Sequence, residues 1–276
     1  MAHATHAVTL LGGAIFDRIA GFGAFVRFAL ATLAALVEHP ARCLRWRQLA
    51  PQLLAVGTAS VPVVAVTGCF IGMILAVEGF AQFEAIGASR RIGGIINVSV
   101  VKQIGPVLAA VMVAGRVGGA IAAELGTMKV TEQLDAMRAM AASPIVRLVA
   151  PRFVACLVMT PILTVFSDLL GAWGAWVVVV KLFGVSSTEY WHYTAQFMVA
   201  LDPVNGLIKA TAFGAAIGFI CCYKGFTCGP GAEGVGRAAT SAFVASFIAI
   251  VAINLVLVDF LQTVTRLVYG GISSAL

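Results

Sequence analysis

Apolar residues gather along this chain into five long runs, separated by shorter segments that carry most of the charge. Each run reaches the roughly 20 residues that an α-helix needs to cross the hydrocarbon core of a bilayer. The pattern therefore predicts five membrane-spanning helices, over residues 53–80, 98–123, 145–180, 204–223 and 238–264.

The third run is the longest and leaves two interpretations open. It is long enough for one tilted or kinked span, with Pro151 and Pro161 as places for a kink. The alternative is that it divides into two shorter spans.

Composition points to the same class of protein. Of the 276 residues, 61% are hydrophobic and 11% are charged, with a mean hydropathy of +1.00. Soluble domains are about 45–50% apolar and about 25% charged. We therefore expect an all-α integral membrane protein. Its net charge of +6 fits an anionic membrane surface. Aromatic residues are not interleaved with the basic clusters, so no nucleic-acid partner is expected.

Residues 1–48 have a different pattern from the five runs. Charged residues interrupt their apolar stretch, and the first apolar segment lacks the flanks of a signal peptide. Apolar residues recur at helical spacing, at Ile15, Ile19, Phe22, Val26 and Leu30. The spacing predicts an amphipathic helix that lies in the membrane interface. We expect residues 1–48 to form this interfacial region and residues 49–276 to form a single transmembrane domain.

The segment between the second and third runs carries the densest charge of the chain. From residue 130 onward, one narrow stripe of a helix holds Val130, Leu134, Met137 and Ala141. The opposite face holds Glu132, Asp135 and Arg138. We expect a short amphipathic helix over about residues 130–142, capped by Thr131 and stopped before Pro144. Its charged face either docks a soluble partner or is merely solvated.

The distribution of Lys and Arg predicts the orientation, because these residues favour the cytoplasmic side. They are more frequent in residues 18–47, 129–152 and 224–237 than in the segments expected on the other side. The N-terminus and the 130–142 helix are therefore expected in the cytoplasm, and the C-terminus outside.

Several polar residues fall within or near the apolar runs. Arg116 lies inside the second run, between Gly115 and Gly119, and Glu124 lies at its end. Small residues four apart allow close helix packing, and an intramembrane charge either has a partner or faces a pathway. Asp168 and Asp259, in the third and fifth runs, are candidates for a proton relay or for structural pairs.

Catalytic and metal-binding patterns are missing from the sequence. It contains no GxxxxGK[ST], HExxH or GxSxG, and no CxxC pair among its six cysteines. We therefore expect no enzyme activity, no metal site and no bound cofactor. Any ATP would be used by a partner.

Three stretches resemble the MlaE (YrbE-type) permeases, the membrane subunits of ABC lipid transporters that work with MCE-domain proteins. They are GPVLAAVMVAGRVGGAIAAELGTMKVTEQLDAM (residues 105–137), LIKATAFG (residues 207–214) and GPGAEGVGRAATSAFV (residues 229–244). The resemblance covers nearly the whole chain.

This resemblance implies a homodimer in a bacterial inner membrane. It implies cytoplasmic ABC ATPase subunits docked on the 130–142 coupling helix, and a periplasmic MCE protein. The cargo would be phospholipid, moved between the two membranes to maintain outer-membrane asymmetry. Some such complexes also contain a STAS-domain subunit. The alternatives are a proton-driven secondary transporter and a non-catalytic membrane scaffold.

The resemblance also implies an outward-facing lipid pocket, formed by Phe80, Lys102, Gln103 and Lys209. The family often has Arg-Glu at the Lys102-Gln103 position, so this chain has an amide where a carboxylate is usual. We therefore expect Lys209 to lack a charge partner and to be free to meet a lipid phosphate.

Overall fold

The computed structural model describes the backbone of residues 2–273, and the side chains of residues 19–41 and 43–267. This part of the chain contains helices and turns but no strand. The α-helices are α1 (Ala2–Glu38), α2 (Pro40–Cys43), α3 (Trp46–Val56), α4 (Val61–Ala85), α5 (Ile92–Ser99), α6 (Gly105–Val113), α7 (Gly119–Val130), α8 (Gln133–Ala139), α9 (Ala150–Trp176), α10 (Ser187–Phe197), α11 (Leu201–Phe226) and α12 (Gly231–Ser273).

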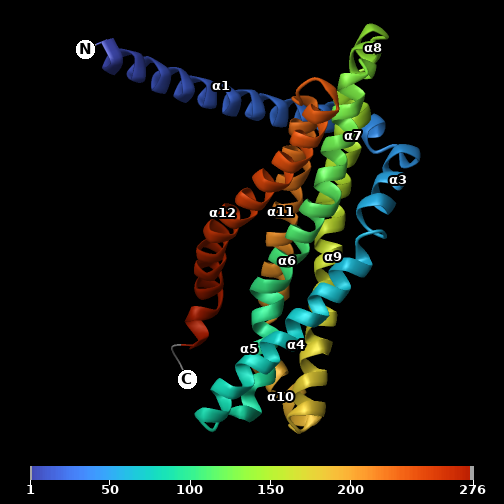
Figure 1. The fold of residues 1–276 in the computed structure, drawn as a ribbon. Helices are drawn as coiled ribbons and strands as arrows, with labels where there is room; N and C mark the ends of the chain where they lie inside the picture. The colour runs from blue at the N-terminus through green and yellow to red at the C-terminus, as the bar shows by residue number, and fades with distance from the viewer. Residues whose placement is uncertain (1, 274–276) are drawn as a thin grey trace.

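Five helical segments run along a common bundle axis, whereas α1 extends sideways from one end (Figure 1). Six described segments are long and apolar enough to cross a membrane, including residues 19–38 of α1. Helix α1 runs across the direction of the other segments in Figure 1, an orientation that a helix lying along a membrane surface would have. The predicted all-α membrane fold is confirmed, whereas the interfacial place of α1 stays a prediction.

Helix α1 contacts the bundle through one face only. The rings of Phe25 and Phe28 pack against Tyr223 of α11, with centroids 5.3 and 5.7 Å apart. The opposite stripe is exposed, at Ile19, Phe22, Val26, Leu30, Leu33 and Val37. An exposed apolar stripe on a helix at the end of a membrane bundle is suited to lipid.

The third apolar run forms one continuous helical segment, Ile145–Leu182, and not two spans. Its central part, α9, packs closely on α4 through small residues. A Cβ added to Gly68 would lie 2.6 Å from the Ser167 carbonyl oxygen, and one added to Gly72 would collide with the Gly171 carbonyl. Close backbone contact of this kind is how small residues stabilise helix pairs in membranes.

The second span is also a single helical segment, Ser89–Val130, and it contains two π-helical turns. The first, Val100–Ile104, contains Lys102 and Gln103. The second, Ala114–Gly118, contains Arg116. Wide turns of this type often mark functional positions, since they leave carbonyl groups without helical partners.

The helix between the second and third spans is shorter than the predicted 130–142 segment. Helix α7 continues to Val130, and Glu132 then adopts a left-handed conformation (φ 58°) before α8 begins at Gln133. Thr131 does not cap α8, because its hydroxyl donates to the Thr127 carbonyl of α7. A second left-handed residue, Ala141 (φ 56°), follows the end of α8. These backbone reversals explain why helical periodicity overestimated the length.

The two ends of the bundle carry different elements (Figure 1). Helices α1, α3 and α8 lie at one end, together with the loop between α11 and α12. Helices α5 and α10 lie at the other end, where α12 also finishes. The elements that the Lys and Arg distribution places on one side therefore lie together, although which side is cytoplasmic stays a prediction.

Candidate functional site

A cavity of about 410 Å³ opens between α5, the start of α11 and the second half of α12, toward the end of the bundle opposite α8. Its lining contains Val98, Ser99, Lys102, Gln103, Ile104, Asn205, Lys209, Val258, Leu261 and Gln262. Three of the four residues expected in a lipid pocket, Lys102, Gln103 and Lys209, are thus brought together by the fold.

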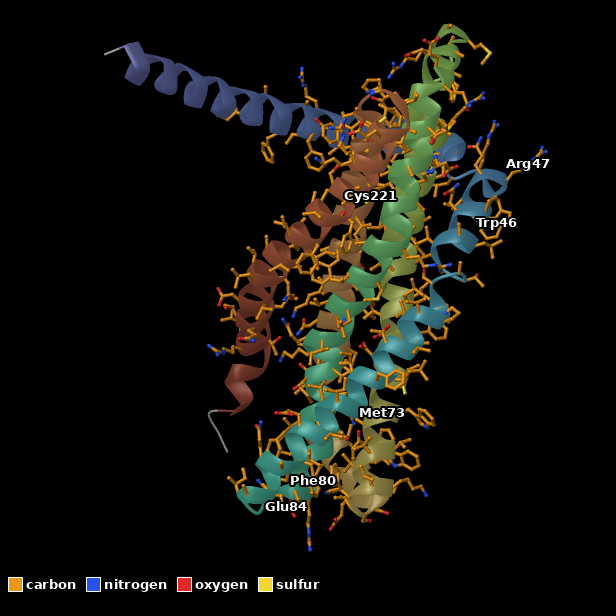
Figure 2. The ribbon with its side chains drawn as sticks, viewed as in Figure 1. Trp46, Arg47, Met73, Phe80, Glu84 and Cys221 are labelled. Atoms are coloured by element: carbon orange, nitrogen blue, oxygen red, sulfur yellow. The ribbon has the colours of Figure 1, made fainter. Side chains whose placement is uncertain are left out.

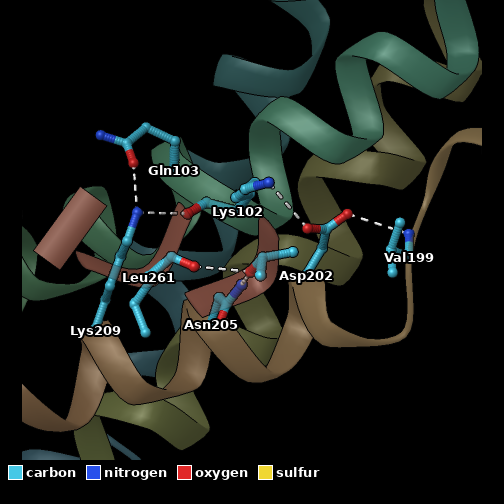
Figure 3. A network of polar contacts seen from close by, with 8 residues as sticks. Lys102, Gln103, Val199, Asp202, Asn205, Lys209 and Leu261 are labelled. Carbon is cyan, nitrogen blue, oxygen red and sulfur yellow. Dashed lines mark hydrogen bonds and ion pairs between the residues drawn. The ribbon is translucent and has the colours of Figure 1, made fainter. Parts of the chain in front are cut away.

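The π turn and the proline after it determine what Lys209 can bind. In an α-helix the carbonyl of Lys102 would accept from the N–H of residue 106, but that residue is Pro106, which has none. The free carbonyl accepts a hydrogen bond from Lys209 Nζ at 3.0 Å (Figure 3). The backbone irregularity therefore creates half of the lysine's binding site.

The other half is the amide of Gln103, whose Oε1 accepts from Lys209 Nζ at 2.6 Å. Lys209 is only 2% exposed. The expectation that the lysine would be free is therefore wrong, because an amide oxygen accepts its hydrogen bond as a carboxylate would. The amide carries no charge, however, so the positive charge of Lys209 is not neutralised.

Lys102 has a charged partner that the sequence analysis missed. Its Nζ lies 3.1 Å from Asp202 Oδ1, and Asp202 Oδ2 accepts from the backbone N–H of Val199 (Figure 3). Asp202 is the second residue of α11 and lies seven residues before Lys209, so both are on one helix face. That spacing could have revealed it, but the predicted fourth apolar run begins only after Asp202.

The site therefore holds two ammonium groups and one carboxylate. Lys102 and Asp202 balance each other, whereas Lys209 is bonded only to neutral oxygens. The Lys102 side chain is 30% exposed and lines the cavity. The cavity thus has an excess positive charge next to the apolar wall formed by Val258 and Leu261 of α12, which suits an amphipathic anion.

Two polar contacts fix the walls of the cavity. Asn205 Nδ2 donates to Thr265 Oγ1 of α12 at 3.0 Å. On α5, Asn97 Oδ1 accepts from the buried Tyr190 hydroxyl of α10 at 3.0 Å. Burial raises the pKa of Tyr190 to about 12, and the Asn97 hydrogen bond opposes that rise. The hydroxyl therefore stays protonated at neutral pH and keeps α5 attached to α10.

Phe80 is not part of this cavity. Its ring stacks on Phe183, with centroids 3.9 Å apart and an interplanar angle of 4°. Phe80 lies near the end of the bundle, close to Glu84 (Figure 2). The structure therefore separates it from the other three expected residues.

Arg116 lies apart from the cavity as well. It is exposed in the single chain, and its Nη1 donates to Ser60 Oγ at 3.3 Å. Gly115 and Gly119 face α12, near Phe243 and Ala239, without the tight contact seen between α4 and α9. Among residues 19–267, no hydrogen bond or ion pair joins Arg116, Asp168 and Asp259 to one another, so the candidate relay residues form no connected path.

Glu124 has a clear partner at the α8 end of the bundle. Its Oε1 lies 2.8 Å from Arg152 Nη2 of α9, and Arg152 Nη1 also donates to the Leu148 carbonyl. The Arg152 side chain is 4% exposed and that of Glu124 is 56% exposed, so the pair joins a buried guanidinium to a carboxylate that faces outward. It joins α7, which leads to the coupling helix, to α9.

On α8 itself, the two predicted faces are recognisable. Leu134 is 2% exposed and Met137 is partly buried, whereas Val130 belongs to α7 and is 37% exposed. The charged residues Glu132, Asp135 and Arg138 are exposed, and Arg138 pairs with Asp135 at 2.6 Å. The helix therefore presents a charged surface beyond the end of the bundle (Figure 1).

Comparison with known proteins assigns the chain to a family. The family model Permease MlaE matches residues 49–260, which is most of the chain. The chain belongs to the MlaE permease family. It is thus a membrane permease subunit, and the resemblance noted in the sequence is confirmed.

Individual relatives agree with this assignment. A probable ABC transporter permease protein of Rickettsia typhi is 40% identical over 239 residues, covering 87% of this chain and 91% of the relative. The intermembrane phospholipid transport system permease protein MlaE of Haemophilus influenzae is 31% identical over 251 residues, covering 91% and 95%. The chloroplastic protein TRIGALACTOSYLDIACYLGLYCEROL 1 of Arabidopsis thaliana is 35% identical over 217 residues, covering 79% and 62%.

Proposed function

We propose that this MlaE-family permease moves phospholipid between a bacterial inner membrane and a periplasmic MCE-domain protein, and so maintains the lipid asymmetry of the outer membrane. Two copies form the membrane unit. Cytoplasmic ABC ATPases supply the energy, and a STAS-domain subunit is an additional partner in some complexes. The N-terminus and α8 lie in the cytoplasm, and the cavity opens toward the periplasm.

The observation that carries the proposal is the cavity with an uncompensated lysine beside an apolar wall. A phospholipid has the same two parts, a phosphate and acyl chains. The phosphate would meet the Lys102 and Lys209 ammonium groups, and the chains would lie against Val258 and Leu261. The intermembrane phospholipid transport system named for the Haemophilus relative supports this cargo.

The connection between the two ends supports an external energy source. The same helical segment, Ser89–Val130, carries Lys102 and Gln103 near one end and leads to α8 at the other. A partner that moves α8 would therefore move the π turn that holds Lys209. The sequence has no phosphate-binding loop, so this partner would provide ATP hydrolysis.

Site-specific crosslinking tests the proposal. A photo-reactive residue at position 261 faces the cavity, whereas one at position 255 lies on the exposed side of the same helix, where Leu255 is 76% exposed. In the ATPase-bound complex in liposomes, lipid crosslinking at 261 should change when ATP is added. Crosslinking at 255, which reports bulk lipid, should not. Equal and ATP-independent labelling at both positions would contradict the proposal.

A further inference from the structure

A second polar cavity, of about 610 Å³, lies between the start of α3 and the loop that follows α8. Its lining contains His39, Arg45, Gln48, Ala141, Ala142, Ser143, Val146 and Arg147. It is separate from the lipid cavity, since the two share no residue and lie toward opposite ends of the bundle. We call it the α3 cavity.

The α3 cavity is basic. Two guanidinium groups, Arg45 and Arg147, line it together with the imidazole of His39, and its lining contains no carboxylate. Among the described side chains, neither arginine lies within ion-pair distance of a carboxylate. Arginine binds phosphate through paired N–H groups, so two unpaired arginines on one cavity favour a phosphate group.

The backbone adds to this preference. Arg45 directly precedes α3 and Gln48 lies in its first turn, whereas Ser143 precedes the Ile145–Leu182 segment and Arg147 lies in its first turn. Neither helix start has a side-chain cap. The N–H groups of Gln48 and Arg147 donate to the carbonyls of Arg45 and Ser143, so the backbone contributes only the positive end of each helix dipole, which adds to the attraction of the two arginines.

One lining atom requires a different kind of group. Gln48 Oε1 is buried and has no hydrogen-bond donor among the described residues. A buried acceptor without a donor is destabilising. A ligand that fills this cavity would satisfy it by bringing a hydroxyl or ammonium donor next to its phosphate.

The surroundings place the α3 cavity at the level of a membrane surface. Trp46, which follows Arg45, is 73% exposed, and Leu44 is 45% exposed. Both Trp46 and Arg47 project from the outer side of the bundle near its α8 end (Figure 2). Exposed tryptophan and arginine beside a spanning helix are typical of the headgroup region of a bilayer.

We propose that the α3 cavity binds the headgroup of an anionic phospholipid that carries a hydroxyl or ammonium donor, as phosphatidylglycerol does. Arg45 and Arg147 hold the phosphate, and Gln48 accepts from the headgroup. The bound lipid braces the 140–147 loop, which connects α8 to the third span. This lipid is a fixed component of the permease and not its cargo.

Native mass spectrometry of the delipidated full-length protein tests this site without any transport step. Three lipids of equal acyl-chain length separate the effect of the negative charge from that of the hydrogen-bond donor. They are phosphatidylglycerol, phosphatidylmethanol, which has the charge but no donor, and zwitterionic phosphatidylcholine. Phosphatidylglycerol should bind about tenfold more tightly than phosphatidylcholine, with phosphatidylmethanol in between. Inorganic phosphate is the fourth probe and should compete only weakly.

Three variants assign the binding to residues. Arg45→Gln with Arg147→Gln should remove the preference for anionic lipid, whereas Arg90→Gln with Arg91→Gln, at the other end of the bundle, should keep it. Gln48→Leu should make phosphatidylglycerol and phosphatidylmethanol equivalent while both stay tighter than phosphatidylcholine. This variant keeps both arginines, so it tests the site even if the double variant does not fold.

Several results would overturn the proposal. One is an unchanged preference for phosphatidylglycerol in the Arg45 and Arg147 variant. Another is inorganic phosphate binding as tightly as the lipid. A third is no lipid preference in the wild type, together with loss of ATPase co-purification in the double variant, which would assign the α3 cavity to an acidic partner surface.

Discussion

The amide of Gln103 sets the charge of the cavity that we propose binds lipid. A buried lysine with only neutral acceptors is costly in a membrane, and a carboxylate in that position would reduce the cost. The chain nevertheless has an amide that makes the same 2.6 Å hydrogen bond without neutralising Lys209. We interpret the retained charge as the feature that attracts a lipid phosphate.

Gln103→Glu tests this interpretation. The new carboxylate should pair with Lys209, raise the melting temperature and weaken binding of an anionic lipid several-fold, because the cavity loses its excess positive charge. Thermal unfolding and lipid titration of the purified protein check both effects. Gln262→Glu is the matched control: it also adds a carboxylate to the cavity lining, but Gln262 makes no described hydrogen bond to Lys209. Its melting temperature should not rise. A rise in both variants, or in neither, would contradict the pairing.

At the scale of elements, the contact between α4 and α9 stabilises the bundle through backbone contact and not through large side chains. Without a hydrophobic driving force between helices in lipid, close packing has to supply the attraction. Gly72 contributes most directly, since its Cα faces the Gly171 carbonyl with no room for a methyl group.

Gly72→Ala should therefore lower the stability by about 1–3 kcal/mol or prevent assembly of the bundle. Gly79→Ala on the same helix is the control, because its Cβ would lie 3.7 Å from the nearest atom, an ordinary contact. Detergent-resistance and thermal-unfolding measurements compare the two. Equal stability of both variants would show that α4 and α9 do not pack as described.

Helix α8 presents its charge where a soluble partner would reach it. The exposed carboxylates of Glu132 and Asp135 have no buried role, so reversing them should leave the fold intact. We expect Glu132→Arg with Asp135→Arg to abolish co-purification of the ATPase subunit. Glu84→Arg, at the opposite end, should have no effect (Figure 2). Normal assembly in the α8 double variant would exclude this face as the docking surface.

At the scale of the whole molecule, the all-α membrane fold follows from hydropathy because helix length and apolar content decide what crosses a bilayer. Residues 19–38 of α1 meet the same criteria, so the interfacial place of α1 stays a prediction. The family resemblance, and not hydropathy, predicted that Lys102, Gln103 and Lys209 lie together. Asp202, the partner of Lys102, was missed because hydropathy excluded it from the predicted span. The left-handed conformation of Glu132 was missed because periodicity carries no information about backbone reversals. Phe80 was misplaced because ring stacking with Phe183 depends on the three-dimensional fold.

The long segment Ser89–Val130 runs from the cavity to the α8 end of the bundle. It begins near the lipid cavity, contains the π turn that holds Lys209, pairs with α9 through Glu124 and Arg152, and ends next to α8. A movement passed from α8 across the reversal at Glu132 would reach the cavity along one helical segment, and this is the basis of our account of the permease.

ATP-dependent lipid transfer measures the central claim most directly. The permease, reconstituted in liposomes with its ATPase and a soluble MCE acceptor, should transfer fluorescent phospholipid only when ATP is hydrolysed. Lys209→Met should reduce that transfer at least about tenfold while ATPase binding is retained, because the phosphate loses its buried cation. Transfer at the wild-type rate by Lys209→Met, or transfer without ATP, would contradict the account.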